Sequence, residues 1–220
     1  DRAHAEQARL SGEPFIQHPL AVALLLADIH LDAEAVAAGL LHDSVEDTSL
    51  SLEVIRRQFG APVADLVDGV TKLESVTVAS LDEHQAQNLR KVLLAMARDM
   101  RVVLIKLADR LHNLRTAWVY AIEKRESYGQ ETLEIFAPLA GRLGIEEWRW
   151  QLEDYAFKLL DPDRYRDLAR WLLAERRARE SAIADVQEQL RARLDDADID
   201  ALIQSRVKHI YSIEQKIRRK

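Results

Sequence analysis

The stretch LHDSVEDT, at residues 41–48, places a histidine beside an aspartate and adds two carboxylates one helical turn later. If this stretch is helical, His42 and Glu46 lie four residues apart, as do Asp43 and Asp47, so all four groups follow one helix edge. The preceding residues 34–41 are almost wholly apolar and predict a helix whose body is buried. Such a helix costs free energy when it ends in four titratable groups, unless a divalent cation neutralises them. The stretch therefore predicts a metal site.

The composition indicates a helical globular protein without thiol chemistry. The 220 residues are 48% hydrophobic and 31% charged, and the net charge of −6 argues against broad nucleic-acid binding. Because the chain has no cysteine, its metal ligands must be His, Asp, Glu or Asn. The longest apolar run, residues 20–27, is too short to cross a bilayer. We expect a cytoplasmic protein, and we expect both ends to be cut, because the chain lacks an initial methionine and stops within a basic helical pattern.

Helix signals in the first half predict an all-α fold. Pro19 suits the first turn of a helix through Leu26, and Asp32 can cap the helix that carries the acidic stretch. Further signals are a helix from Ser51 to Gly60, one from Pro62 to near Gly69, a loop at 74–84, and a helix from about Glu83 to about Arg98. A leucine stripe then indicates a packed helix, at Leu104, Leu107, Leu111 and Leu114.

The second half continues as helix with two clear interruptions. Residues 127–159 should be helical apart from breaks around Pro138 and Gly144. Trp148 and Trp150 cannot share a helix face, so we expect one of them in the core and the other half-exposed. The pair Asp161-Pro162 marks a boundary before a charge-laced helix at 165–194. Acidic residues at 195–198 then break the pattern, and a different segment begins near Ile199.

A second set of polar residues occurs in KLADRLHNLRT, residues 106–116. Asp109 and Asn113 share a helix face, and His112 competes with them as a ligand on spacing alone. Together with His18 and the His42-Asp43 pair, Asp109 gives a site of two histidines and two aspartates. Such a mixed nitrogen and oxygen site suits Mn²⁺, Fe²⁺ or Zn²⁺ better than Ca²⁺.

The order His…His-Asp…Asp resembles the HD-domain metal-dependent phosphohydrolases. The longer strings SGEPFIQHP (11–19), LHDSVEDT (41–48), DGVTKL (68–73), KLADRLHNLRT (106–116) and APLAGRLGI (137–145) are similar to the hydrolase domain of bacterial Rel/SpoT-type enzymes, which make and destroy the alarmone (p)ppGpp. The string RVKHIYSIEQK (206–216) resembles the opening of their synthetase domain. The resemblance implies an all-α HD bundle at 1–155, a helical connector at 156–197 and the amino-terminal fragment of the synthetase domain at 198–220.

The resemblance also implies a role for each matching residue. The metal ligands, typically for Mn²⁺, would be His18, His42, Asp43 and Asp109. Glu46 and Asp47 would orient and deprotonate the attacking water, and Glu46, packed against other acidic groups, should have a raised pKa. Arg9 would stack on the guanine, and the nucleotide pocket would also contain Ser11, Asn113 and Thr116. Leu10 departs from the pattern, since a lysine usually follows that arginine, so one phosphate contact is in doubt. The synthetase positions that grip ATP phosphates match Arg206, Lys208, Ser212 and Lys216.

These matches imply manganese-dependent hydrolysis of the 3′-pyrophosphate of (p)ppGpp, yielding GDP or GTP and pyrophosphate. We expect no synthetase activity, because the sequence stops before that domain could form, and any ribosome contact would involve regions beyond it. Two alternatives stay open: an HD phosphohydrolase for another nucleotide, and a non-catalytic regulatory HD domain. Intact ligand positions argue against the second alternative. His112 is expected to bond a backbone carbonyl or a neighbouring side chain rather than the metal.

Overall fold

The computed structural model describes residues 7–74, 98–203 and 209–219, and every regular element in those ranges is helical. The one β-type contact in these ranges is an isolated bridge between Ala8 and Pro14. The all-α prediction is therefore confirmed. The chain divides into two compact units, residues 1–159 and residues 160–220.

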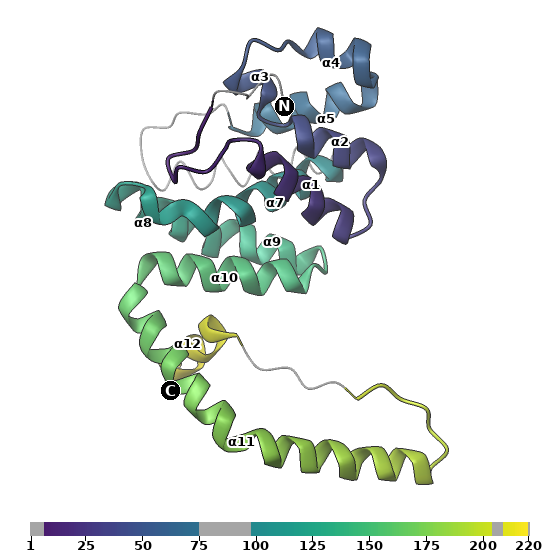
Figure 1. Cartoon of the computed structure of the whole chain (residues 1–220), viewed down its shortest axis with the longest axis vertical. Coiled ribbons are helices and arrows are strands. Elements are labelled where there is room, and N and C mark those ends of the chain that lie inside the picture. The colour runs from purple at the N-terminus through teal and green to yellow at the C-terminus, as the bar shows by residue number, and fades with distance from the viewer. Residues whose placement is uncertain (1–6, 75–97, 204–208, 220) are drawn as a thin grey trace. The chain divides into compact units, whose positions relative to one another are not determined.

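The first unit is a bundle of helices around a buried central helix (Figure 1). Its elements are α1 (Gln17–Asp28), α2 (Ala33–Leu41), α3 (Ser44–Asp47), α4 (Leu52–Phe59), α5 (Ala61–Glu74), α7 (Met100–Thr116), a 3₁₀ turn (Ala117–Val119), α8 (Ile122–Glu131), a π-helical turn (Thr132–Phe136), α9 (Ala137–Arg142) and α10 (Glu146–Leu160). Helix α7 packs against α1, α2 and α5. The predicted leucine stripe is buried, since Leu107 and Leu111 are fully enclosed and Leu104 and Leu114 nearly so.

Several predicted helix ends are confirmed by capping contacts. The Asp32 carboxylate accepts a hydrogen bond from the Ala35 amide at 2.8 Å, and Ser51 caps α4 through the Val54 amide at 3.4 Å. Gly60 ends α4 at φ 91°, a conformation that favours glycine. The prediction that the next helix ends near Gly69 is wrong, because α5 continues to Glu74. Gly69 instead permits close packing, since a Cβ there would lie 2.7 Å from Val102 Cγ2 of α7.

The acidic stretch is not one continuous helix, so the prediction that its four polar groups follow a single helix edge is wrong. Helix α2 ends at Leu41, and the short α3 begins at Ser44. The Ser44 hydroxyl donates to the Leu41 carbonyl at 2.6 Å, and this side-chain bond competes with the helical backbone bond there. His42 and Asp43 therefore lie at a bend between two helices.

The remaining helices follow the sequence pattern closely. Pro138 occupies the first turn of α9, directly after the π-helical turn, and Gly144 adopts φ 79° before α10. One tryptophan of the pair was expected in the core and the other half-exposed; Trp148 is the buried one and Trp150 is half-buried. The predicted loop at 74–84 and helix at 83–98 lie almost wholly outside the described residues.

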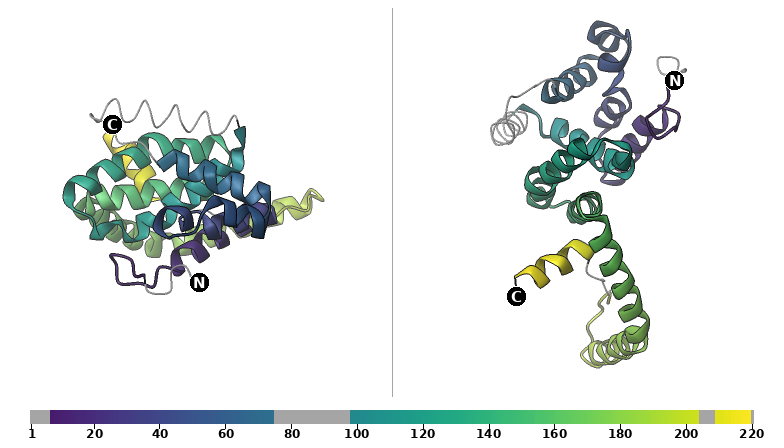
Figure 2. Two further views of the ribbon diagram at one scale, coloured as in Figure 1. Left: turned by 90° about the horizontal axis from the view of Figure 1, so that it is seen from above. Right: turned by 90° about the vertical axis from the view of Figure 1, so that its left-hand side faces the viewer.

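In the described residues of the second unit, 160–203 and 209–219, there is one long helix and one short helix. Helix α11 (Pro162–Asp196) begins where Asp161 accepts a hydrogen bond from the Arg164 amide at 3.0 Å. Helix α12 (Ile210–Arg218) folds back onto the first part of α11, where Arg164 Nε donates to Glu214 Oε2 at 2.9 Å (Figure 2). The division at 159/160 comes from this structure, whereas the functional boundaries at 155 and 197 stay predictions.

Candidate metal and nucleotide site

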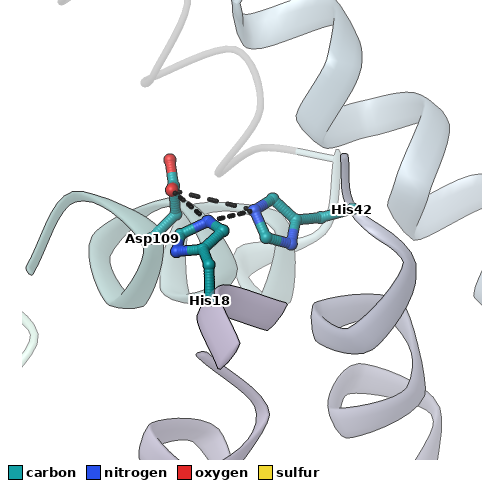
Figure 3. A group of neighbouring side chains, drawn as sticks. All are labelled: His18, His42 and Asp109. Atoms are coloured by element: carbon teal, nitrogen blue, oxygen red, sulfur yellow. Dashed lines mark hydrogen bonds and ion pairs between the residues drawn. The ribbon is translucent and has the colours of Figure 1, made fainter. Parts of the chain in front are cut away.

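Three ligand-type side chains from separate segments meet in the core of the first unit (Figure 3). His18 comes from α1, His42 from the bend after α2, and Asp109 from α7. His18 Nε2 lies 3.2 Å from His42 Nε2 and 3.2 Å from Asp109 Oδ1. All three residues are at most 2% exposed. The fold thus brings these three side chains together in one buried polar cluster.

Asp43 lies against the same cluster from its more open side. Its Oδ1 atom is 2.9 Å from His42 Nε2, and its Oδ2 atom is 3.3 Å from His18 Nε2. The Asp43 side chain is 19% exposed. Asp43 lies in the short segment between α2 and α3, directly after His42.

The donor set fits a divalent metal ion. Two donors that share one ion at about 2.1 Å, in roughly tetrahedral or octahedral geometry, are about 3.0–3.4 Å apart. The observed separations of 2.9–3.7 Å between His18, His42, Asp43 and Asp109 bracket this range. Two imidazoles and two carboxylates, with no thiolate, are typical of borderline divalent cations rather than of Ca²⁺.

The two buried carboxylates of the cluster, Asp43 and Asp109, are stabilised by nearby positive charge. Burial alone would lower the pKa of His42, but hydrogen bonds to Asp109 and Asp43, together with their negative charge, raise it to about 10. Burial opposes ionisation of both carboxyls, yet Lys106 and the two histidines hold the pKa of Asp109 well below its usual value, and the histidines do the same for Asp43. Without a metal ion, a proton on His42 therefore balances part of the negative charge of Asp43 and Asp109, the role that a bound cation would take.

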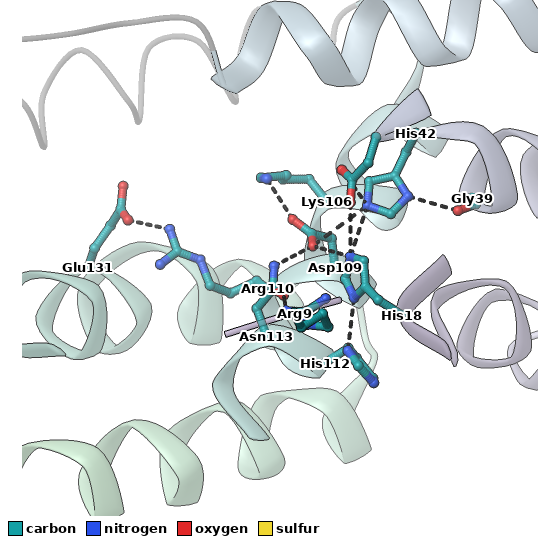
Figure 4. Close-up of polar contacts among 11 residues, drawn as sticks. Arg9, His18, Gly39, His42, Lys106, Asp109, Arg110, His112, Asn113 and Glu131 are labelled. Carbon is teal, nitrogen blue, oxygen red and sulfur yellow. Dashed lines mark hydrogen bonds and ion pairs between the residues drawn. The ribbon is translucent and has the colours of Figure 1, made fainter. Parts of the chain in front are cut away.

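Further contacts orient the ligand side chains from behind (Figure 4). His42 Nδ1 lies 2.8 Å from the Gly39 carbonyl and must donate to it, so Nε2 faces the cluster. Lys106 Nζ donates to Asp109 Oδ2 at 2.6 Å, and Asn113 Nδ2 donates to Asp109 Oδ1 at 2.5 Å. Each carboxylate oxygen of Asp109 thus has a partner on its own helix, one turn before or after it.

Three residues of the cluster, His18, Asp43 and Asp109, line a cavity of about 340 Å³, a size suited to a small molecule. Among the predicted site residues, its lining includes Arg9, Ser11, His18, Asp43, Glu46, Asp47, Asp109, Asn113 and Thr116. Residues widely separated in the sequence are therefore brought together. Partial desolvation, followed by the charge of Asp43, raises the pKa of Glu46, which agrees in direction with the prediction.

One side of the cavity is built by a tight loop before α1. The Arg9 amide bonds the Glu13 carbonyl at 2.9 Å, and Gly12 adopts φ 85°, which a residue with a Cβ disfavours. Arg9 Nη2 donates to Asn113 Oδ1 at 2.5 Å. Asn113 therefore joins Arg9 to Asp109 through one amide group, accepting from the first and donating to the second.

The sequence interpretation missed part of the lining. Phe15, Val119 and Tyr120 also border the cavity. Tyr120 directly follows a 3₁₀ turn, so helical spacing from α7 could not place it. Of the predicted synthetase positions, Arg206 and Lys208 lie outside the described residues, while Ser212 and Lys216 lie four residues apart on α12.

Residues 1–146 match the family model of the HD domain, and this range contains the histidine and aspartate cluster. The chain belongs to the HD domain family. The HD domain also resembles the crystal structure of lmo0812 from Listeria monocytogenes EGD-e, with a TM-score of 0.53 and 27% identity over 69% of this chain and 99% of that one. Among the described residues, no helix is both long and apolar enough to span a membrane.

Curated relatives of this HD domain are much longer proteins. A Synechocystis protein named probable guanosine-3′,5′-bis(diphosphate) 3′-pyrophosphohydrolase is 50% identical over 97% of this chain, which covers 28% of that protein. The bifunctional (p)ppGpp synthase/hydrolase SpoT of Escherichia coli is 45% identical over 98% of this chain, which covers 31% of that protein. The chain thus spans about three tenths of the length of these relatives.

Proposed function

We propose that this HD domain hydrolyses the 3′-pyrophosphate of (p)ppGpp to GDP or GTP and pyrophosphate, with Mn²⁺ held by His18, His42, Asp43 and Asp109. One observation supports this most directly: His18 and Asp109 of the buried histidine and aspartate group line the cavity that Arg9 and Asn113 border. The names of the relatives support the choice of substrate. We place the activity in the cytoplasm, without nucleic acid, membrane or ribosome as partner of this segment.

The reaction needs a nucleophile, a proton acceptor and a fixed substrate. When bound, a divalent cation lowers the pKa of water and polarises a phosphate oxygen. Glu46 accepts a proton from the attacking water, whose oxygen bonds to the phosphorus nearest the ribose 3′ oxygen. The bond between that phosphorus and the 3′ oxygen breaks, and the oxygen takes up a proton to become the 3′ hydroxyl. Asp47, the next residue of α3, orients the water.

The other residues of the cavity act by positioning. Arg9 stacks on the guanine, and its bond to Asn113 holds the guanidinium over the cavity. Ser11 and Thr116 contribute hydroxyl groups to the nucleotide side of the lining. Because phosphoryl transfer depends mainly on alignment and charge stabilisation, these contacts should contribute to both binding and turnover.

The direct test is hydrolysis of ppGpp by the purified chain with Mn²⁺ and with chelator. We expect stoichiometric GDP and pyrophosphate with Mn²⁺, and neither product with chelator or with an Asp109→Ala variant. Intact ppGpp after prolonged incubation with Mn²⁺ would refute the proposal. A panel of other nucleotides separates this activity from that of an HD phosphohydrolase with a different substrate, and ATP with GDP tests the expected absence of synthesis.

A further inference from the structure

His112 is a buried histidine that the proposed reaction does not use. It lies on α7 one turn after Asp109, and its Nδ1 atom is 2.8 Å from His18 Nδ1 (Figure 4). The two rings are 4.9 Å apart at an angle of 51°. His112 Nδ1 therefore meets the nitrogen of His18 that points away from the metal cluster, which excludes the simple reading of His112 as a fifth ligand through this atom.

The protons on His18 can be counted from these contacts. Its Nε2 atom faces Asp109 Oδ1 at 3.2 Å, Asp43 Oδ2 at 3.3 Å and His42 Nε2 at 3.2 Å. If Nε2 binds a cation, its lone pair must be available, so the single proton of neutral His18 lies on Nδ1. At 2.8 Å, the acceptor for that proton is His112 Nδ1, which must then be unprotonated.

We propose that His112 is a positioning residue, which accepts a hydrogen bond from His18 Nδ1 and so keeps His18 in the tautomer that binds metal. This inference rests on the proposed metal site. The Gly39 carbonyl holds His42 in the same way, but a carbonyl can only accept, whereas an imidazole can also donate. In the reverse arrangement, His112 donates to His18 Nδ1, and His18 Nε2–H points at the Asp43 and Asp109 carboxylates.

The consequence concerns the two histidine ligands: the Gly39 carbonyl fixes the tautomer of His42, whereas His112 allows His18 to adopt either tautomer. Both arrangements of the His18–His112 pair satisfy the 2.8 Å contact, but only one leaves a lone pair toward the cluster. Cation binding therefore selects a tautomer of two histidines together. Outer partners of metal-bound histidines typically change metal affinity by about 10–100-fold when removed.

Two variants of the full chain test this role. His112→Leu removes the acceptor, whereas His112→Asn keeps an amide oxygen near the position of Nδ1. Titration calorimetry with Mn²⁺ should show roughly 10–100-fold weaker binding for the leucine variant and a value within a few-fold of wild type for the asparagine variant. His30→Asn is the matched control, because His30 lies outside the cluster at φ 59°, which asparagine tolerates, and Mn²⁺ binding should be unchanged.

A spectroscopic measurement reads the tautomer itself. With Zn²⁺ as a diamagnetic probe, the ¹⁵N spectrum of the imidazoles should show a proton on His18 Nδ1 and none on His112 Nδ1 in the wild-type chain. This measurement decides the matter even if His112→Leu does not fold. A Zn²⁺-loaded wild type with the proton on His112 Nδ1, or a folded leucine variant that binds Mn²⁺ as tightly as wild type, would overturn the role of His112 alone. A wild-type chain that binds neither metal would overturn the proposed metal site as well.

Discussion

Gly39 is a position where one methyl group should disturb both stability and metal binding. In Gly39→Ala, the new Cβ would lie 2.5 Å from Leu26 Cδ1 and 3.5 Å from Val22 Cγ1, both on α1. Leu26 and Val22 are fully buried, so neither has free space into which to move. The same glycine supplies the carbonyl that holds His42, and α1 carries His18. Separating α1 from α2 therefore moves two ligands apart.

The expected magnitude follows from two opposing effects. Overpacking a buried contact typically costs about 1–3 kcal/mol, whereas alanine is favoured over glycine within a helix by about 1 kcal/mol. The free energy of unfolding should therefore fall by about 1 kcal/mol, which lowers Tm by roughly 2–4 °C in a chain of this size. A shifted outer contact to His42 should weaken Mn²⁺ binding by about tenfold, the lower end of the range for such contacts.

Gly141→Ala on α9 provides a matched control. Its Cβ would lie 2.6 Å from Arg149 Cδ, but the Arg149 side chain is 28% exposed and can turn away. The surface ion pairs of Arg149 contribute at most about 1 kcal/mol, so this variant should be neutral or slightly stabilised with unchanged Mn²⁺ affinity. Urea denaturation followed by circular dichroism, together with calorimetric Mn²⁺ titration, compares the two variants. If Gly39→Ala gained stability as Gly141→Ala should and bound Mn²⁺ normally, the packing argument would be refuted.

Two further substitutions test the site, and a third, with its partner change, tests the Arg110–Glu131 ion pair outside the cavity. Glu46→Gln should lower kcat by about 10²–10⁴-fold. The raised pKa of Glu46 means that its protonated form stabilises the fold at low pH and that this stabilisation is lost as pH rises. The variant should therefore be more stable than wild type at pH 7 and equal to it well below pH 4.5, as thermal melts across that range can show. Leu10→Lys, at an 80% exposed position on the cavity wall, should lower KM for ppGpp severalfold with little change in kcat, and an unchanged KM would exclude a phosphate contact there. Arg110→Met removes the buried cation that pairs with the half-buried Glu131 and should destabilise the chain by up to about 3–5 kcal/mol. Adding Glu131→Leu should recover much of that loss, and equal stability of the single and double variants would contradict the ion-pair explanation.

Local signals in the sequence predicted the helices well, but the long-range contacts were not predictable from spacing. The caps at Asp32 and Ser51 depend on residues three positions away, so the sequence shows both partners. The break at His42 coincides with the hydrogen bond from the Ser44 hydroxyl to the Leu41 carbonyl. The sequence does not show which carbonyl accepts this bond, so a continuous helix was expected. A glycine at position 69 looks locally like a helix end, but the structure shows that a glycine is needed there because Val102 of α7 packs closely against it.

The same limit explains the candidate site. The resemblance supplied most of the residues that line the cavity, because motif order identifies them one by one, but it missed Phe15, Val119 and Tyr120. Spacing along α7 puts His112 and Asp109 on adjacent turns, and the expectation that His112 bonds a backbone carbonyl or a neighbouring side chain rather than the metal did not name that partner. Only the approach of His18 from α1, at 2.8 Å, shows which nitrogen His112 meets.

Helix α7 carries two buried charges of opposite sign on consecutive residues, and the bundle neutralises them separately. Asp109 faces His18, His42 and Lys106, while Arg110 pairs with Glu131 and lies 3.9 Å and 4.1 Å from the ring centres of Tyr128 and Phe136. Because consecutive residues point about 100° apart on a helix, the two sets do not share partners. Arg110 with Glu131 is complete as a neutral pair, whereas the Asp109 side holds a second carboxylate, Asp43, and has to recruit a proton at His42. The charge imbalance is therefore confined to the cavity side of α7, where a cation can enter.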